Sequence, residues 1–209
     1  MGPTLRVDVW SDYVCPFCYL EMPVLEQLRR ERDGQVTISW RAFELRPEPV
    51  PTLDPDGEYL HRVWGQSVYP MARERGMALR LPPVQPRSRK AFEAAAFAGE
   101  AGRFDTMHEA LFRAFFEHGR DIGEVAVLQE IGASVGLDPD RLGADLTEGR
   151  RTAGVLEDEC AAAAIGITGV PAMVLSRPGG GERAYLLSGA VPYAALAEAV
   201  ERALAEPGG

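Results

Sequence analysis

Two cysteines separated by two residues, Cys15 and Cys18, have the type and spacing that most clearly predict chemistry in this sequence. The alternating run Leu5–Trp10 before them is typical of a β-strand, and the apolar residues after them recur at helical spacing. Cys15 is therefore expected at the start of a helix and Cys18 one turn further on. Pro16 suits the first helical position, because its ring presets φ and its missing N–H would have no partner there.

This placement predicts how the two thiols would work together. The unpaired N–H groups and the positive end of the dipole at a helix N-terminus favour the thiolate form of Cys15. Cys18 is close enough to attack a mixed disulfide formed on Cys15 and release the product. The pair thus supplies an attacking thiol and a resolving thiol, which indicates a dithiol–disulfide active site.

Two other interpretations of the cysteine pair compete with this one. Cysteines at this spacing often provide two of the four ligands of a zinc site, and two inert core cysteines would have the same spacing. The remaining candidate zinc ligands form no second closely spaced pair: Cys160, His61, His108 and His118. We therefore expect no bound metal and favour dithiol chemistry.

Two carboxylates near the pair are candidates for proton transfer, Asp8 on the expected first strand and Asp12 just before the cysteines. If that strand is central in the sheet, Asp8 is at least partly buried, and an unpaired buried carboxylate is costly. One interpretation is that Asp8 handles a proton, for example from Cys18. The other is that it forms an ion pair with an arginine. The negative charge of Asp12 would oppose a thiolate nearby.

The composition limits the class of protein. The chain has 209 residues, a net charge of −9 and 46% hydrophobic residues, which is typical of a soluble globular protein and disfavours nucleic acid or an anionic membrane as partner. No apolar run has the length of a membrane span, and no signal peptide is recognisable before the first strand. These features predict a cytoplasmic protein, in which a disulfide would be transient and catalytic.

Periodicity predicts an α/β fold interrupted by a large all-helical insertion. The expected strands cover 5–10, 36–43, 172–175 and 184–187, the last two joined by a glycine-rich hairpin at 178–181. The expected helices cover 15–33, 58–76, 88–101, 104–117, 123–135, 138–146 and 192–205. Another helical stretch carries Leu156, Cys160 and Ala164 on one face, which favours a buried structural thiol at Cys160.

The Cys15-Pro16-Phe17-Cys18 motif, together with the distant Val170-Pro171, resembles the thioredoxin superfamily. The helical block between the two halves makes the chain similar to the DsbA family. Five stretches resemble its cytoplasmic FrnE-like branch: Ser11–Tyr19, Phe43–Pro47, Leu111–Phe116, Val135–Asp138 and Gly166–Pro171. That branch is related to 2-hydroxychromene-2-carboxylate isomerases and kappa-class glutathione transferases.

The resemblance implies a domain organisation and a role for each site residue. Residues 1–50 and 152–209 would form a discontinuous thioredoxin-like domain, and residues 51–151 the inserted helical domain. Cys15 would be the exposed nucleophile and Cys18 the buried resolving thiol. Pro171 would be a cis-proline, and Val170 would offer its backbone to an extended substrate. Pro16 and Phe17 would complete the substrate-binding surface.

The leading hypothesis is a thiol–disulfide oxidoreductase that acts on protein or small-molecule disulfides. It would need no bound cofactor, with glutathione as a candidate redox partner, and it would be a monomer or a homodimer. One alternative is a glutathione-dependent isomerase or transferase, against which Cys15 argues because that branch carries a serine there. The other alternative is a redox-independent chaperone or peptide-binding module.

Overall fold

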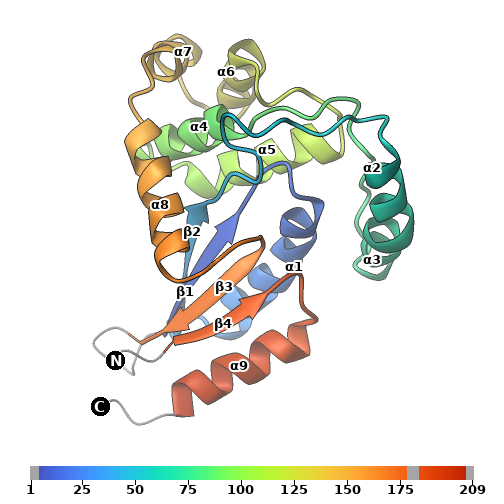
Figure 1. The fold of residues 1–209 in the computed structure, drawn as a ribbon. Helices are drawn as coiled ribbons and strands as arrows, with labels where there is room; N and C mark the ends of the chain where they lie inside the picture. The colour runs from blue at the N-terminus through green and yellow to red at the C-terminus, as the bar shows by residue number, and fades with distance from the viewer. Residues whose placement is uncertain (1–4, 178–183, 206–209) are drawn as a thin grey trace.

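The fold is built on a four-stranded mixed sheet. The computed structural model describes residues 5–177 and 184–205. Strands β1 (Leu5–Ser11), β2 (Val36–Ala42), β3 (Ala172–Ser176) and β4 (Ala184–Ser188) lie in the order β2-β1-β3-β4 (Figure 1). β1 pairs in parallel with β2 and antiparallel with β3, which pairs antiparallel with β4. The expected glycine-rich hairpin at 178–181 lies outside the described residues.

Each face of the sheet is covered by helices. Helices α1 (Pro16–Glu31) and α9 (Tyr193–Ala205) cover one face, where Leu5, Val7 and Val9 alternate along β1 and are fully buried. Helix α8 (Thr152–Ala164) packs along β2 and contributes Ala162 to a smaller cluster around Trp10 on the other face (Figure 1). Because both faces are covered, every residue of β1 except Arg6 is buried, the polar Asp8 and Ser11 included.

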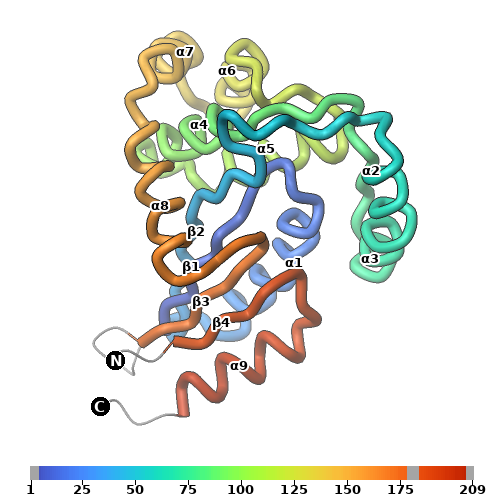
Figure 2. The backbone as a smooth tube through the Cα atoms, in the orientation of Figure 1, coloured from blue at the N-terminus to red at the C-terminus, as the bar shows by residue number. Residues whose placement is uncertain are grey.

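A helical block is inserted between β2 and β3. It contains α2 (Glu58–Val63), a π-helical turn (Trp64–Val68), α3 (Tyr69–Glu74), α4 (Arg89–Glu100), α5 (Phe104–Phe116), α6 (Val125–Ser134) and α7 (Pro139–Glu148). The long connection over residues 43–57 leaves the sheet at β2 and runs across to α2 (Figure 2). The α/β fold with a helical insertion is confirmed. The single helix expected over 58–76 is divided into α2, the π-helical turn and α3, and the other helices and strands with predicted bounds begin and end within two residues of them.

The core of the helical block is continuous with the cysteine segment. Tyr19 of α1 stacks on Phe112 and Phe116 of α5, with ring centroids 5.3 and 5.7 Å apart. Cys15 and Cys18 belong to the same apolar cluster as these aromatic residues. The inserted helices therefore position the cysteine segment by direct packing. Domain boundaries at residues 50/51 and 151/152 stay a prediction.

The expected burial of Cys160 is wrong. Cys160 is exposed on α8, as are Leu156 and Ala164 of the face assigned to the core. The buried face of this helix instead carries Val155 and Ala162. Alanines and small residues on all sides of α8 leave little periodic contrast, so spacing alone chose the wrong face. Of the helices in the described ranges, none is both long and apolar enough to cross a membrane.

Candidate active site

Cys15 and Cys18 lie at the N-terminus of α1, as predicted. Cys15 is the N-cap residue in an extended backbone conformation, Pro16 is the first helical residue, and the Cys18 N–H donates to the Cys15 carbonyl oxygen over 3.1 Å. Both thiols are free. The expectation of an exposed Cys15 is wrong: it is 4% exposed and Cys18 is 1% exposed. Cys15 is covered because the loop before β3 packs over it.

The Cys18 thiol lies in a buried environment that keeps it protonated. Burial raises the pKa of Cys18 well above its usual range, and the adjacent Cys15 thiol raises it further. The Asp12 backbone N–H donates to Cys18 Sγ over 3.4 Å, and this contact and the neighbouring Ser11 side chain lower the pKa without offsetting burial. Cys18 is thus suited to react only after Cys15 has formed a mixed disulfide, when Cys18 can attack Cys15 Sγ.

The loop before β3 brings a distant segment against Cys15. The Val170–Pro171 peptide bond is cis, and the Cys15 thiol donates to the Val170 carbonyl oxygen over 3.5 Å. Pro171 is buried, and its carbonyl oxygen accepts from the Gly189 N–H over 2.8 Å, which fixes the loop to the segment after β4. Val170, in the Val170-Pro171 pair singled out from the sequence, therefore contacts Cys15 despite its distance in sequence.

Asp12 fastens the cysteine loop to the connection that follows β2. Its carboxylate accepts from the backbone N–H of Leu45 over 2.7 Å and from that of Val14 over 3.2 Å. Complete burial raises the pKa of Asp12 to about 6, although hydrogen bonds from Leu45, Ser88 and Val14 lower it. Asp12 reaches Cys18 through its backbone N–H and not through its carboxylate. Proton transfer by Asp12 therefore stays a prediction, and the contacts indicate a positioning role.

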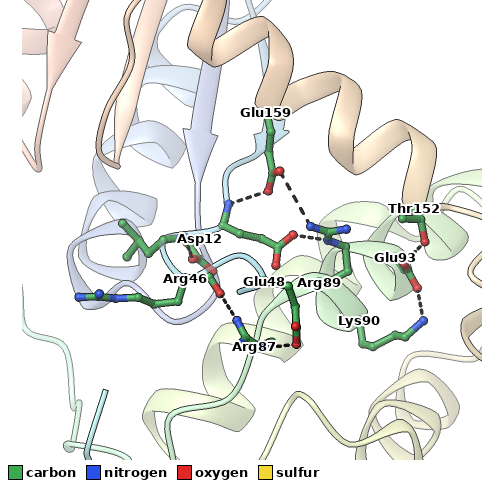
Figure 3. Close-up of polar contacts among 11 residues, drawn as sticks. Asp12, Arg46, Glu48, Arg87, Arg89, Lys90, Glu93, Thr152 and Glu159 are labelled. Atoms are coloured by element: carbon green, nitrogen blue, oxygen red, sulfur yellow. Dashed lines mark hydrogen bonds and ion pairs between the residues drawn. The ribbon is translucent and has the colours of Figure 1, made fainter. Parts of the chain in front are cut away.

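A buried cluster of charged residues next to Asp12 could not be found from sequence spacing. Glu44 forms an ion pair with Arg89 of α4, and its backbone N–H donates to Glu159 of α8 over 3.1 Å (Figure 3). Burial raises the pKa of Glu44 to about 7, with Arg89 lowering it and Glu159 raising it again. The cluster joins the end of β2 to α4 and α8. The only sequence signal was Glu44 within the stretch Phe43–Pro47.

Replacing Asp12 by asparagine should change how stability depends on pH. The pKa of Asp12 is about 6 in the folded protein against 3.8 for an ordinary aspartate, so the folded state binds the proton more tightly. The resulting stabilisation is fully present below about pH 4 and is lost as the pH rises through about 6. The free energy of unfolding of the wild type, relative to Asp12→Asn, should fall by about 3 kcal/mol from about pH 4 to 8.

Urea unfolding of both proteins at a series of pH values measures this difference. Asp33→Asn is the matched control, because Asp33 is exposed after α1 and its removal should leave the pH dependence unchanged. Wild-type and Asp12→Asn curves that run parallel across the range would contradict the assignment.

Asp8 has the ion-pair environment that was one of the two expectations. It is buried on β1, and its carboxylate accepts from Arg6 over 2.6 Å and from Arg41 over 3.0 Å. Arg41 also bonds Asp158 of α8 over 3.0 Å. Both Asp8 oxygens are thus engaged by arginines, and no hydrogen bond joins Asp8 to either thiol in the part of the chain that the structure describes. These contacts favour a structural role for Asp8.

Pro16 and Phe17 are the other two residues expected to bind substrate. Pro16 and Phe17 are half-buried next to the cysteines, and Phe17 packs against the shared core. Within residues 5–177 and 184–205, no group of three or more histidine, cysteine or acidic side chains is arranged to hold a metal ion.

Comparisons with known proteins agree with this geometry. A sequence profile described as DSBA-like thioredoxin domain matches residues 6–201. The uncharacterized protein YwbO of Bacillus subtilis is 36% identical over 138 residues, which cover 65% of this chain and 68% of YwbO. The crystal structure of a probable DsbA oxidoreductase, SCO1869 of Streptomyces coelicolor, has a TM-score of 0.78 and 29% identity, and the match covers 97% of this chain and 91% of that one.

A more distant structure shares the fold. The cytosolic disulfide reductase DsbM from Pseudomonas aeruginosa, solved with GSH, has a TM-score of 0.68 and 22% identity, with 94% of this chain and 99% of that chain covered. At this identity the match shows that the two proteins share a fold.

Proposed function

Because this chain belongs to the DsbA-like thioredoxin-domain family, we propose that it is a thiol–disulfide oxidoreductase that uses Cys15 as nucleophile and Cys18 as resolving thiol. One observation carries the proposal: Cys15 lies at the N-terminus of α1, one turn before Cys18 and in contact with the loop of the cis Val170–Pro171 bond. The sequence stretches that resemble the FrnE-like branch support the proposal that this protein belongs to that branch.

The proposed reaction moves two electrons from the dithiol to a substrate disulfide. The Cys15 thiolate attacks one substrate sulfur, which forms a mixed disulfide and releases the other substrate sulfur as a thiolate that takes up a proton. Cys18 then loses its proton and attacks Cys15 Sγ. This step frees the second substrate thiol and leaves a Cys15–Cys18 disulfide. Oxidation of a substrate dithiol follows the same steps in reverse.

Each part of the site has a task in this cycle. The helix N-terminus stabilises negative charge on Cys15 Sγ. The Asp12 backbone N–H donates to Cys18 Sγ and would stabilise the Cys18 thiolate that attacks the mixed disulfide. The Val170 carbonyl oxygen, which accepts from the Cys15 thiol in this structure, would become free to bond an extended substrate segment once that thiol has reacted. Asp12 would hold this arrangement through Leu45 and Val14.

The substrates would be protein or small-molecule disulfides. The size of the helical block and the half-buried Phe17 beside the cysteines are compatible with a protein segment as well as with glutathione. A cytoplasmic location would keep the dithiol mostly reduced, so that disulfide formation would be transient. The description of DsbM as a cytosolic disulfide reductase agrees with such a role.

The test is the reduction potential of the cysteine pair. A Cys160→Ser variant, which removes the exposed third thiol, would be equilibrated in glutathione redox buffers and trapped with a thiol-blocking reagent. We expect a reversible Cys15–Cys18 disulfide. A potential near about −270 mV would identify a reductant, and one near about −120 mV an oxidant or isomerase. Failure to form the intramolecular disulfide in any buffer would overturn the proposal.

A further inference from the structure

The Ser11 hydroxyl is a buried polar group without a hydrogen-bond partner. Ser11 is the last residue of β1 and is 3% exposed, and its backbone carbonyl oxygen accepts from the Phe43 N–H over 3.1 Å. Its Oγ, in contrast, is sealed from solvent and bonds none of the residues that the structure describes. A buried donor without a partner costs free energy, and such groups are rare enough that each one requires an explanation.

This hydroxyl lies beside Cys18 Sγ, the sulfur of the second thiol. Asp12, which directly follows Ser11, donates its backbone N–H to Cys18 Sγ over 3.4 Å. Ser11 Oγ is joined to that nitrogen through its own Cβ, Cα and carbonyl carbon, so the two atoms are within about 4 Å of each other. The Ser11 side chain is also one of the groups that lower the pKa of Cys18. Donors from two adjacent residues therefore converge on one sulfur.

The protonation state of Cys18 explains why the hydroxyl has no partner. Burial raises the pKa of Cys18 well above its usual range, so the residue is a neutral thiol, and the sulfur of a thiol is a weak acceptor. A thiolate is a strong acceptor, because hydrogen bonds to an ionised group are about twice as strong as those between neutral groups. The hydroxyl thus gains a good partner only when Cys18 ionises, which is typical of a donor preorganised for charge that develops in a reaction.

We propose that Ser11 donates a hydrogen bond to the Cys18 thiolate while this thiolate attacks the mixed disulfide. The inference rests on the proposed function, in which Cys18 resolves an adduct on Cys15. In this step Cys18 loses its proton, its sulfur bonds Cys15 Sγ, and the bond between Cys15 Sγ and the substrate sulfur breaks. The departing substrate thiolate takes up a proton, which balances the one that Cys18 lost. Ser11 keeps its own proton throughout.

Two titratable side chains lie close to Cys18: Cys15 on α1 and Asp12 in the loop before it. In the mixed disulfide Cys15 carries no charge, because its sulfur is bonded to the substrate. The Asp12 carboxylate accepts from two backbone N–H groups and forms no hydrogen bond with Cys18 in the described part of the chain. The helical block contributes apolar residues to the cluster that contains Cys18. Because none of these groups differs between the wild type and a Ser11 variant, a change in rate reports on the hydroxyl.

Ser11→Ala should slow the resolution of the adduct but not its formation. Reduced protein in the Cys160→Ser background is mixed with excess oxidised glutathione and quenched with acid at a series of times, and mass spectrometry follows the adduct and the internal disulfide. Without the hydroxyl the pKa of Cys18 rises and less thiolate is present, although the remaining thiolate is a stronger nucleophile. Conversion of the adduct should therefore slow about three- to tenfold at about pH 7, and adduct formation should stay within about twofold.

Three further measurements separate this role from a structural one. The deficit of Ser11→Ala should shrink as the pH rises, because a larger fraction of Cys18 is then ionised in both proteins. The reduction potential at about pH 7 should not change, since Cys18 is a neutral thiol in both reduced proteins. In urea unfolding, the reduced variant should be at least as stable as the wild type, because the substitution removes a buried hydroxyl that has no partner.

Two matched variants complete the test. Ser11→Thr keeps a hydroxyl on β1 and should resolve the adduct within about twofold of the wild-type rate, and Ser39→Ala makes the same change on β2 and should alter neither step. If Ser11→Ala resolves the adduct as fast as the wild type, or if its deficit is equal at every pH, this inference is wrong while the proposed function stands. If the protein with Ser11 intact forms no internal disulfide, the proposed function and this inference are both wrong.

Discussion

A Cys18→Ser variant of this protein should accumulate a stable mixed disulfide at Cys15. With oxidised glutathione in excess, Cys15 attacks and becomes glutathionylated, but no second thiol is present one turn along α1 to release the adduct. The experiment uses the Cys160→Ser background, because the exposed Cys160 would otherwise form adducts of its own. Mass spectrometry should find one glutathione per chain in the variant and an internal disulfide without adduct when Cys18 is present.

The matched Cys15→Ser variant should show the opposite behaviour. The buried Cys18, whose pKa is raised by burial, should form little adduct under the same conditions. Insulin reduction should fall at least about a hundredfold in both variants, since the two thiols act as one unit. Equal rates of insulin reduction by the wild type and Cys15→Ser would contradict the mechanism. A glutathione adduct on Cys18 in preference to Cys15 would reverse the roles assigned to the two thiols.

Most helices and strands could be predicted from local signals, whereas the order of the strands could not. Alternation marks β1, Gly34 (φ 70°) turns the chain between α1 and β2, and Asp138 caps α7 with its side chain. Each of these signals acts within a few residues, so the chain around them decides the local structure. The cysteine pair was predictable for the same reason, because its spacing and its helix position are both local.

The surroundings of the pair depend on contacts between distant segments. The arginines that hold Asp8 come from the same strand and from β2, and sequence alone left the ion pair and the proton-transfer role equally open. The cover over Cys15 is formed by the Val170 loop, which no local pattern places over the thiol. The prediction that Cys160 is buried was wrong for a related reason, since the packing of α8 on β2 decides which side of this helix is buried.

The buried ion pair between Arg75 and Glu21, which the sequence did not predict, connects the helical block, α1 and the segment after β4. Arg75, at the end of α3, donates to Glu21 of α1 over 2.9 Å and to the Val191 carbonyl oxygen over 2.8 Å. Glu21 is fully buried and also accepts from the Val191 N–H over 3.1 Å. The helical block is thereby fastened to α1, which carries the cysteines, and to the segment after β4, whose Gly189 bonds Pro171.

Removing the arginine should therefore cost more stability than any surface change. Arg75→Met keeps most of the side-chain volume but leaves Glu21 buried with a single donor, and we expect a loss of about 3–5 kcal/mol in the free energy of unfolding at pH 8. Burial already raises the pKa of Glu21 to about 7 with Arg75 present. Lowering the pH to about 5 should protonate Glu21 in the folded variant and reduce the loss.

Two further variants separate the ion pair from side-chain packing. Arg73→Met changes an exposed arginine two residues earlier and should cost less than about 0.5 kcal/mol. Glu21→Gln/Arg75→Met removes the buried charge and should recover part of the loss, but not the part due to the bond from Arg75 to the Val191 carbonyl oxygen. Guanidinium unfolding measures all three variants. If Arg75→Met and Arg73→Met lose equal stability, the pair does not fasten the helical block to the cysteine-bearing helix.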